Sequence, residues 1–479
     1  MKRIAIIGGG ISGLSAAFDL EKQKSRGAQL ECVLFEASPR FGGVIQTEQV
    51  DECIIEAGPD SFLSEKPWAA DLCRELGLAD QLIGSNDTAR TTYILVKGRL
   101  VPLPDGMMFM VPTKLMSAFL SPLFSWSTKL RMVREWFYRA PHHASEVSVA
   151  EFVERHYGRE MVERVADPLL AGVYGGSADE LSVSAVLPRF VEMEAKHGSL
   201  GKAMIASRRR GRAERRPAGQ PRTDVPTLFT SLKSGMQQMV DALLTQIPAS
   251  NCRLSTRVEG VKRESNKWLV MSGGHTEEFD GVIIALPAHH AAGILAEASE
   301  IATDLATIRY SSSITVALGY DETVRVSLPA GFGFLIPRSE NKRMLAATFV
   351  HNKFPHRAPQ NTALIRSFLG GSRDEEILKN SEDEIEAVVR RELEQVLGIK
   401  IQPRFVRIYK WDHAMAQYGI GHGERIVRIR QRAAEMAGLA LAGNAYGGIG
   451  VPDCIRSGSE AAAKILQDLQ IAQPAIQRA

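Results

Sequence analysis

The sequence predicts a mixed α/β protein with more than one domain. An apolar run, a glycine-rich turn and a helical pattern follow one another within residues 2–20. Residues 313–369 alternate in the manner of a sheet, and a capping box at Ser381 and Glu384 opens a helix after them. Local patterns also predict helices at 68–78 and from Ser148 towards Val165, a hairpin that turns at Lys97 and Gly98, and strands at 253–261 and 279–287. At 479 residues the chain is long enough for two or three domains with a sizeable core.

The opening unit is typical of a dinucleotide-binding strand, turn and helix. Residues 4–7 form an apolar run suited to a strand buried on both faces, and helical spacing of apolar residues follows Gly13. Gly8, Gly10 and Gly13 lie between them with the spacing G-x-G-x-x-G. These glycines allow a tight turn, leave no Cβ near a pyrophosphate and let the helix pack closely on the strand.

A second strand is expected at residues 30–35, and it ends at Glu36. A carboxylate there can accept the hydroxyl protons of an adenosine ribose, and it stands roughly 20 residues beyond the last glycine, as this unit requires. An isolated glycine match could also be a turn without a ligand, but strand, helix and carboxylate together favour a nucleotide site. Arg40, Gly42 and Gly43 then supply an arginine and a second glycine pair suited to the other side of a diphosphate.

This extended unit resembles the FAD-binding segment of the flavin amine oxidase and porphyrinogen oxidase families. The resemblance implies that residues 56–60 (Glu-Ala-Gly-Pro-Asp) lie along the ribityl chain and the flavin ring. Three further stretches carry it: residues 167–182, 411–422 and 443–454. The first of these has the strings Pro-Leu, Gly-Val-Tyr and Leu-Ser, which resemble protoporphyrinogen and coproporphyrinogen oxidases rather than general amine oxidases.

The resemblance implies three domains, of which two are discontinuous. The Rossmann-like FAD-binding domain is expected to comprise residues 1–65, 227–290 and 408–479. The mixed-sheet substrate-binding domain is expected to comprise residues 66–104 and 291–407. Residues 105–206 are expected to form a helical domain. The arginine-dense residues 207–226 are expected to form a mobile basic loop rather than a patch for nucleic acid or acidic lipid.

The resemblance also assigns the cofactor site. A helix that begins near Pro452 and Asp453 is expected to present its N-terminus to the flavin N1–C2 carbonyl edge, where negative charge appears on reduction. Val258 matches a position whose backbone meets adenine in related flavoproteins. The full set expected to bind FAD is Gly8, Gly10, Ile11, Ser12, Gly13, Glu36, Ala37, Arg40, Gly42, Gly43, Ala57, Gly58, Pro59, Asp60, Val258, Trp411, Gly443, Gly448, Ile449, Gly450 and Val451.

The sequence shows no nucleophile–base pair, no metal cluster and no general base beside the glycine-rich elements. This pattern fits an oxidation driven by aromatisation, in which hydride leaves a carbon of a reduced tetrapyrrole and N–H protons pass to solvent. O2 then reoxidises the flavin and gives hydrogen peroxide. The resemblance therefore implies a porphyrinogen substrate in haem biosynthesis, either protoporphyrinogen IX or coproporphyrinogen III, with FAD as cofactor and no catalytic side chain or metal.

A flat, apolar substrate with carboxylate arms requires apolar contacts and a cation. By resemblance, the contacts are Gly172, Val173, Phe332, Gly333, Leu335 and Phe368. Plant-type relatives carry a carboxylate-binding arginine where this chain has Thr92, which leaves Arg90, Lys97 or another base as its substitute. Phe332, Leu335 and Phe368 are each explained equally well as core residues.

Two other functions stay open at this point. A flavin amine oxidase would share the scaffold, but such enzymes usually place a lysine where Thr315 stands, and Tyr446 alone would have to supply an aromatic cage. A non-catalytic FAD-binding or haem-pathway scaffold protein would keep the nucleotide site without turnover. An assay of peroxide release with amines and with porphyrinogens distinguishes an amine oxidase from a porphyrinogen oxidase. Bleaching of the flavin by a porphyrinogen would exclude a non-catalytic scaffold protein.

Composition bears on partners and location. The 58 basic and 55 acidic residues leave a formal net charge of +3, which is too small to indicate a nucleic-acid partner. Five scattered cysteines predict reduced thiols in a cytoplasmic protein, and the opening strand leaves no room for a signal peptide. A monomer, a homodimer and contact with another haem-pathway enzyme are all compatible with the sequence.

Residues 105–140 are rich in Met, Phe and Pro. Core packing of short helices is the favoured interpretation, because apolar stripes at helical spacing usually face a core. The alternative is an apolar surface that rests on the inner face of the cell membrane or lines an entrance for the substrate, with Lys114, Lys129 and Arg131 at its rim.

Overall fold

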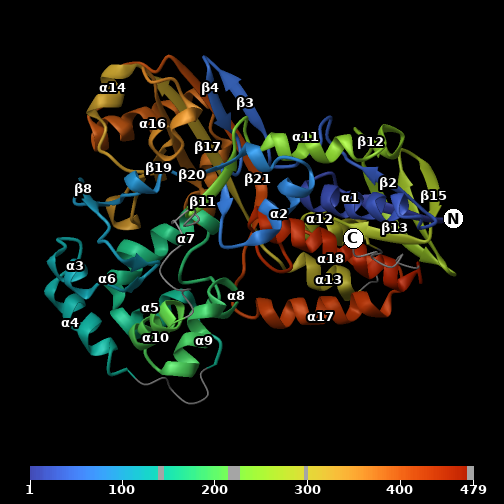
Figure 1. Ribbon diagram of the computed structural model, residues 1–479, viewed down its shortest axis with the longest axis horizontal. Helices are drawn as coiled ribbons and strands as arrows, with labels where there is room; N and C mark the ends of the chain where they lie inside the picture. Colours follow the sequence, from blue (N-terminus) through green and yellow to red (C-terminus); the bar gives the residue numbers. More distant parts are fainter. Residues whose placement is uncertain (139–144, 214–226, 296–299, 472–479) are drawn as a thin grey trace.

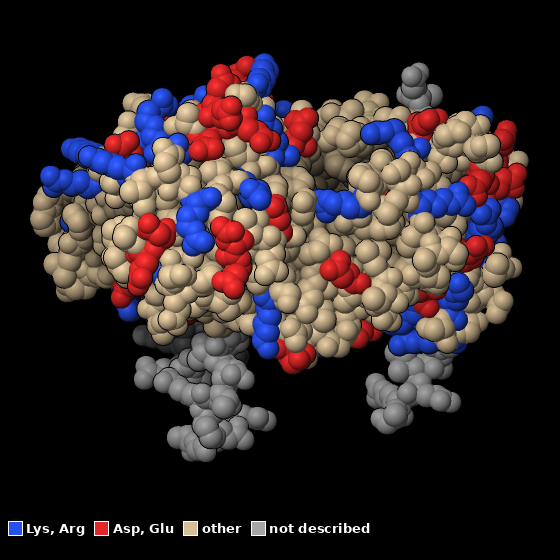
Figure 2. Space-filling view, turned by 90° about the horizontal axis from the view of Figure 1, so that it is seen from above, with Lys and Arg blue, Asp and Glu red and all other residues tan. Residues whose placement is uncertain are grey.

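The computed structural model describes residues 1–138, 145–213, 227–295 and 300–471; for 207–213 it describes the backbone alone. The molecule is elongated (Figure 1). The lobe at one end contains the predicted nucleotide-binding unit, and we call it the nucleotide-binding lobe. The second lobe, at the other end, consists of a second sheet and a layer of helices. The predicted mixed α/β class is confirmed. Lys and Arg side chains alternate with Asp and Glu over the face seen in Figure 2, in keeping with the small net charge.

A five-stranded parallel sheet forms the centre of the nucleotide-binding lobe. Its order is β12 (Cys252–Arg253), β2 (Leu30–Phe35), β1 (Lys2–Ile7), β16 (Gly281–Ile284) and β22 (Leu439–Leu441). Helices α1 (Ile11–Ser25) and α18 (Val451–Asp468) pack on each other, and α11 (Gln237–Thr245) packs on α1. Strands from three distant parts of the chain therefore meet in one sheet, and the predicted strands at 2–7 and 30–35 are confirmed.

Two strands predicted in this lobe are wrong in their extent. The strand expected at 253–261 is divided between β12 and β13 (Val258–Glu264), because Ser255 has a φ of 50° and the Thr256 N–H bonds the Glu36 carbonyl. The strand expected at 279–287 is likewise divided, between β15 (His275–Phe279) and β16. Strands β13, β14 (Lys267–Ser272) and β15 form a separate antiparallel sheet.

A seven-stranded sheet dominates the second lobe. Its order is β21 (Phe405–Ala416), β17 (Tyr310–Tyr320), β20 (Ala363–Gly370), β19 (Met344–Phe349), β18 (Gly333–Leu335), β7 (Thr92–Val96) and β8 (Arg99–Pro102). All neighbours are antiparallel except β18 and β7, and the predicted hairpin at Lys97–Gly98 is confirmed. Helix α16 (Glu382–Leu397) buries its apolar face against one side of this sheet, and its predicted capping box is present. The opposite side is left to face the nucleotide-binding lobe.

Smaller elements connect the lobes. The strands are β3 (Thr47–Val50), β4 (Cys53–Glu56), β5 (Phe62–Leu63), β6 (Leu82–Gly84), β9 (Met107–Met108), β10 (Val111–Pro112) and β11 (Phe229–Leu232). The helices are α2 (Pro67–Glu75), α12 (Ala288–Ile294), α13 (Glu300–Ala306), α14 (Glu322–Ser327), α15 (Val350–Lys353) and α17 (His422–Glu435). The amphipathic helix predicted at residues 68–78 is thereby confirmed in type and ends three residues early.

Short helices form a layer below the second sheet (Figure 1). They are α3 (Leu115–Leu120), α4 (Trp126–Glu135), α5 (Val149–Tyr157), α6 (Arg159–Met161), the π-turn Val162–Ala166, α7 (Asp167–Tyr174), α8 (Val183–Val186), α9 (Pro188–His197) and α10 (Leu200–Ala213). The helix expected to run from Ser148 towards Val165 ends at Tyr157, because Gly158 has a φ of 90°. None of the described helices has the length and apolar character needed to cross a bilayer.

Helix α10 continues past residue 206, where we expected the helical domain to end and a mobile loop to begin. The backbone stays helical to Ala213, so the loop expected at 207–226 is wrong for its first seven residues. The remaining part of that expected loop, residues 214–226, lies outside the described residues.

Candidate functional site

The first glycine turn brings β1 and α1 into close contact. Gly8 has a φ of 109°, and a Cβ placed on Gly13 would lie 1.9 Å from the Gly8 carbonyl oxygen. Only glycine fits such an approach. Gly10 differs from both, because a Cβ on it would meet no other atom within 4 Å. The turn thus leaves open space beside Gly10, where the resemblance expects the pyrophosphate. Ile11 and Ser12 follow as the buried first turn of α1.

The second glycine loop lies directly against the first. The Gly42 N–H donates to the Gly9 carbonyl at 2.8 Å, and a Cβ on Gly43 would lie 3.3 Å from the Gly10 Cα. The Arg40 guanidinium donates to the carbonyls of Phe41, Ile45 and Gly43 of this same loop. Arg40 therefore holds the loop in shape, and its expected approach to a diphosphate stays a prediction.

Glu36 stands where β2 ends, beside the first glycine turn. Its Oε2 accepts the Gly9 N–H at 2.7 Å and its Oε1 accepts the Ser38 N–H at 2.7 Å. Ala37 lies between Glu36 and Ser38 in the chain. The Thr256 N–H donates to the Glu36 carbonyl, and Val258 begins β13 two residues later. The residues expected to hold the adenosine therefore lie together at the carboxyl ends of the parallel strands, where this class of sheet binds nucleotides.

The segment 57–60 is fixed by side chains from the seven-stranded sheet. The Trp411 indole N–H donates to the Ala57 carbonyl at 2.9 Å, and the Arg366 guanidinium donates to the Gly58 carbonyl. A Cβ on Gly58 would lie 1.9 Å from the Val44 carbonyl oxygen, so the segment also packs tightly on the loop after Gly43. Pro59 and Asp60 complete it, and the Asp60 carboxylate accepts from Lys353 Nζ at 2.9 and 3.1 Å.

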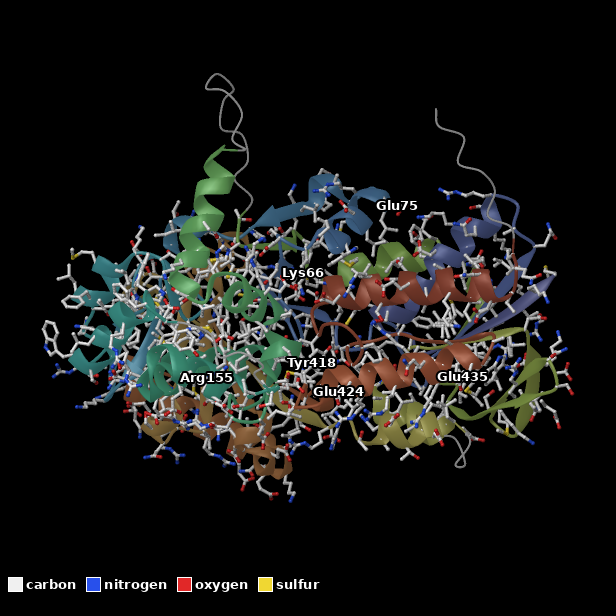
Figure 3. All side chains as sticks on the ribbon, turned by 90° about the horizontal axis from the view of Figure 1, so that it is seen from below. Lys66, Glu75, Arg155, Tyr418, Glu424 and Glu435 are labelled. Atoms are coloured by element: carbon white, nitrogen blue, oxygen red, sulfur yellow. The ribbon has the colours of Figure 1, made fainter. Side chains whose placement is uncertain are left out.

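The loop from Gly443 to Gly450 leads into α18 and is held by Tyr418. The Tyr418 hydroxyl accepts the Gly448 N–H at 2.8 Å and donates to the Asn444 carbonyl at 2.5 Å. Gly450 is the N-cap of α18, Val451 is its first residue, and Ile449 precedes them. Figure 3 shows Lys66 at the start of this helix and Tyr418 where the helical layer meets the nucleotide-binding lobe.

An ion pair between a buried carboxylate and a partly exposed lysine, at the N-terminus of α18, was not predicted from the sequence. The Asp453 side chain is 5% exposed, and its Oδ2 lies 2.5 Å from Lys66 Nζ. A Cβ on Gly448 would lie 2.4 Å from the Asp453 Cγ, so this glycine makes room for a carboxylate of the chain itself. The end of α7 lies near the loop before α18, because the centre of the Tyr174 ring is 5.9 Å from that of Tyr418, whose hydroxyl accepts the Gly448 N–H. Burial, and then the charge of Asp453, raise the pKa of Tyr174 to about 12.

The expected substrate contacts share one face of the seven-stranded sheet. Leu335 pairs with Ala346, Ala346 with Phe368, and Phe368 with Thr315 in one continuous row. Paired residues of antiparallel strands point to the same face, so we name this the apolar row. Gly172 lies against it, since its Cβ would be 3.9 Å from Leu335 Cδ2.

The remaining expected substrate residues lie in different surroundings. Val173 is 56% exposed beside Gly172, although it is apolar, which marks the end of α7 as an open edge of the site. Phe332 is buried, and Gly333 has a φ of 143° with its Cβ position against the Ala347 carbonyl, so packing explains both residues. Arg90 is exposed at the end of the short turn Asp87–Ala89, two residues before the start of β7.

The structure also tests whether the chain fits FAD. The first glycine turn leaves open space at Gly10, Glu36 lies beside that turn, and segment 443–450 ends at the N-cap of α18. Backbone N–H groups at a helix N-terminus favour an anionic group. These residues fit a flavin dinucleotide. The positions of its adenosine at Glu36 and of its ring near segment 57–60 and the start of α18 stay predictions.

Comparisons with known proteins agree with this fit. The model of the family described as flavin containing amine oxidoreductase matches residues 11–466. The coproporphyrinogen III oxidase of Bacillus subtilis is 35% identical over 97% of this chain and 98% of its own length. The mitochondrial protoporphyrinogen oxidase of Nicotiana tabacum is 28% identical over 98% of this chain and 95% of its own.

Among the solved structures, a porphyrinogen oxidase likewise has a higher TM-score against this chain than an amine oxidase has. A putative protoporphyrinogen oxidase from Exiguobacterium has a TM-score of 0.85 at 28% identity, covering 98% of this chain and 99% of that one. Cyclohexylamine oxidase from Brevibacterium oxydans has a TM-score of 0.68 at 17% identity, covering 98% and 99%, which shows the fold alone. The chain therefore belongs to the flavin-containing amine oxidoreductase family, in its group of FAD-dependent coproporphyrinogen III and protoporphyrinogen oxidases.

Proposed function

We propose that this protein is an FAD-dependent oxidase that converts coproporphyrinogen III to coproporphyrin III, with O2 as acceptor and hydrogen peroxide as product. The observation that carries the reaction type is the apolar row, which faces segment 57–60 from the same sheet that holds this segment in place. The relatives named coproporphyrinogen III oxidases are 29% to 35% identical to this chain, and those named protoporphyrinogen oxidases are 28% identical, which favours coproporphyrinogen III over protoporphyrinogen IX.

The chain's own residues bind, orient and shield the reactants. Bound FAD would supply hydride acceptance at its N5 atom and reoxidation by O2. Leu335 and Phe368 offer a flat apolar surface to a tetrapyrrole, and Gly172 opposes them without a side chain. The N-terminus of α18 would lie near the part of a bound flavin that becomes negatively charged on reduction, and fixed backbone dipoles of this kind stabilise charge without reorganising. Protons from the pyrrole N–H groups pass to solvent at the exposed end of α7.

Amine oxidation is not favoured by the same site. Thr315 occupies the row position beside Phe368, and it is 4% exposed with no amino group to offer. Tyr446 is 6% exposed and packs in the core, so it does not form a wall of an open amine pocket. The amine oxidase structures in the comparison share the fold at under 20% identity.

The proposed reaction is tested by feeding the purified enzyme each porphyrinogen in air. We expect porphyrin fluorescence to grow with coproporphyrinogen III, three molecules of peroxide to appear for each porphyrin, and protoporphyrinogen IX to react more slowly. Amines should release no peroxide. Equal rates with both porphyrinogens would contradict the proposed substrate preference. No reaction with either porphyrinogen would contradict the proposed function.

Replacing Gly172 by valine is expected to impair porphyrinogen oxidation selectively. The new side chain would fill the space beside Leu335, where its Cβ alone would lie at 3.9 Å from the leucine. We expect kcat/KM to fall at least about tenfold, which corresponds to roughly 1.4 kcal/mol of transition-state stabilisation. The flavin absorption spectrum should stay unchanged. Gly423→Val in α17 is the control, because a Cβ there meets nothing within 4 Å and lies outside the site; a normal kcat/KM in Gly172→Val would contradict the substrate placement.

Residues 105–138 contain both core and exposed apolar side chains. Met110, Phe124 and Met132 are buried, as the favoured interpretation predicts. An outer apolar face remains, with six side chains exposed by 45% to 80%. It consists of Met116, Leu120, Trp126, Leu130, Val133 and Phe137. On α4 these residues recur at helical spacing, and Figure 1 places α3 and α4 at the outer edge of the helical layer.

We propose that this outer apolar face rests on the surface of an anionic membrane. Residues 106–134 contain no Asp or Glu, and three of their four cations, Lys114, Arg131 and Arg134, are exposed. The fourth, Lys129, is buried. Exposed aromatic and aliphatic side chains with basic neighbours are the signature of helices that lie in the lipid headgroup region. The exposed face is thus complementary to negatively charged lipid in both apolar area and charge.

Vesicle binding tests the membrane contact. We expect the enzyme to sediment with vesicles that contain anionic lipid and to lose this binding at least about tenfold in the variant Trp126→Ser/Leu130→Ser, since about 1.5 to 3 kcal/mol is lost for each large apolar side chain removed from lipid. Val326→Ser is the matched control, because Val326 is 75% exposed on α14, which packs on the seven-stranded sheet and is not part of the helical layer. Equal binding by the double variant and the parent would contradict the proposal.

A further inference from the structure

A buried cluster of charged side chains lies behind the segment 57–60. It consists of Glu56, Asp60, Lys353, Arg357 and Arg366, and we call it the buried charge cluster. The side chains of Arg357 and Arg366 are 1% and 6% exposed, and those of Glu56 and Lys353 are 4% and 10% exposed. Charged groups are seldom buried to this extent without a strong local reason, because desolvation of an ion costs several kcal/mol.

Arg366 contacts both parts of the proposed site. Its guanidinium donates to the Gly58 carbonyl, and its Nη1 lies 3.8 Å from Asp60 Oδ2. Its Cζ also lies 4.9 Å from the centre of the Phe368 ring, two residues along β20 and on the same face. One buried side chain therefore joins the segment expected to carry the flavin to a residue of the apolar row.

Lys353 completes the contact from α15. Its ammonium group donates to both oxygens of Asp60, at 3.1 and 2.9 Å, and to the Ser61 hydroxyl at 3.1 Å. Burial opposes ionisation of Asp60, but Lys353 and Arg366 outweigh it, so the pKa of this carboxyl lies well below its usual range. Asp60 is therefore ionised at neutral pH.

The cluster has more positive than negative charge. Three cations face two carboxylates, since Arg357 Nη1 lies 2.8 Å from Glu56 Oε1 and the other two cations share Asp60. Burial raises the pKa of Glu56, and a neutral Glu56 would increase the positive excess. The adjacent Arg407 and Glu48 pair at 2.7 Å and cancel each other. The excess is positive in either state of Glu56.

We propose that Arg366 is a positioning residue of the oxidation and that the buried charge cluster raises the reduction potential of the bound flavin. This inference rests on the proposed function for the place of FAD and substrate. A hydride carries two electrons and one proton, so its arrival gives an oxidised flavin one negative charge while N1 stays unprotonated. A buried positive charge beneath segment 57–60 stabilises that charge more than it would in water.

Arg366 also fixes the geometry of hydride transfer. Its contacts with Gly58 and Phe368 hold the flavin segment and the apolar row at one separation, and rates depend steeply on such alignment. Lysine at this position would retain the charge but would lose the planar group that bonds Gly58 while stacking on Phe368.

The test is the midpoint potential of the holoenzyme, measured against reference dyes without porphyrinogen. Arg366→Met and Lys353→Met should lower the potential, and Asp60→Asn should raise it. We expect each to change the reduction equilibrium at least tenfold, about 30 mV for a two-electron couple. Arg390→Met is the matched control, because Arg390 lies on α16, on the opposite side of the sheet, and should leave the potential unchanged.

The conservative variant separates charge from position. Arg366→Lys should restore the potential and keep a reduced kcat with little change in KM. Unchanged potentials, or shifts of the same sign in Lys353→Met and Asp60→Asn, would overturn the electrostatic role. If Arg366→Met fails to fold, Lys353→Met and Asp60→Asn still test this role. A normal kcat in Arg366→Lys would overturn the positioning role. Failure of the proposed function is distinguishable, since the parent would then show a potential but no porphyrinogen turnover.

Discussion

Replacing Gly10 by alanine is expected to weaken FAD binding at least about tenfold, or 1.4 kcal/mol, without affecting the fold of the apoprotein. Gly10 has a φ of −71° and a ψ of 176°, which alanine adopts freely, and its Cβ would meet no protein atom within 4 Å. The added methyl group would instead occupy the space left for the pyrophosphate. Titration of the apoprotein with FAD measures the affinity, and thermal unfolding of the apoprotein checks the fold.

Two control variants accompany the Gly10→Ala measurement. Gly13→Ala should impair both folding and binding, because its Cβ would collide with the Gly8 carbonyl at 1.9 Å. Gly423→Ala should leave the FAD affinity unchanged, because its Cβ also meets nothing within 4 Å but lies in α17, away from the site. Unaltered FAD affinity in Gly10→Ala would show that the first glycine turn does not hold the pyrophosphate.

Replacing Glu135 by alanine is expected to destabilise the helical layer by about 3 to 5 kcal/mol, the usual cost of removing one partner from a buried ionic network. Glu135 is 2% exposed at the end of α4. Its carboxylate lies 3.2 Å from His156 Nδ1, and it accepts the Leu200 and Gly201 N–H groups at 2.6 and 3.1 Å and the Ser199 hydroxyl at 3.0 Å. Its loss would leave four donors in the core without an acceptor.

The Glu135 carboxylate connects α4 with α5 and α10, and it favours the charged form of a histidine. His156 on α5 also lies 3.1 Å from Glu194 on α9. Burial opposes its protonation, but the two glutamates outweigh this effect and raise its pKa. Thermal unfolding of Glu135→Ala measures the loss. Glu163→Ala is the surface control, since Glu163 is 53% exposed and pairs with the exposed Arg159 at 3.3 Å, and its effect should stay within about 0.5 kcal/mol. Equal stability of the two variants would contradict the structural role of Glu135.

Local sequence patterns predicted the parts of the fold that local physics determines. The spacing of Gly8, Gly10 and Gly13 and the carboxylate at Glu36 lie within one strand–turn–helix unit, so their arrangement follows from short-range geometry. The capping box at Ser381 has the same local character. The family-like strings at 167–182 and 443–454 lie far apart in the chain, and only the resemblance indicated that they meet.

Long-range side-chain contacts could not be predicted in this way. Asp453 and Lys66 are 387 residues apart, and Arg366 and Gly58 are 308 apart, so no spacing in the sequence indicates either contact. A charged residue within an apolar strand, as Arg366 is in β20, was the available signal for a buried ionic site. Periodicity also failed on α4, because its apolar residues are mostly exposed, while its buried residues are Met132 and the polar Thr128, Lys129 and Glu135.

The most direct measurement is an anaerobic titration of the purified holoenzyme with coproporphyrinogen III. We predict that the visible absorption band of the oxidised flavin disappears as coproporphyrin fluorescence grows, and that the band returns when air is admitted. A protein that is colourless and takes up no added FAD, or one whose flavin band is unchanged by the porphyrinogen, would contradict the account.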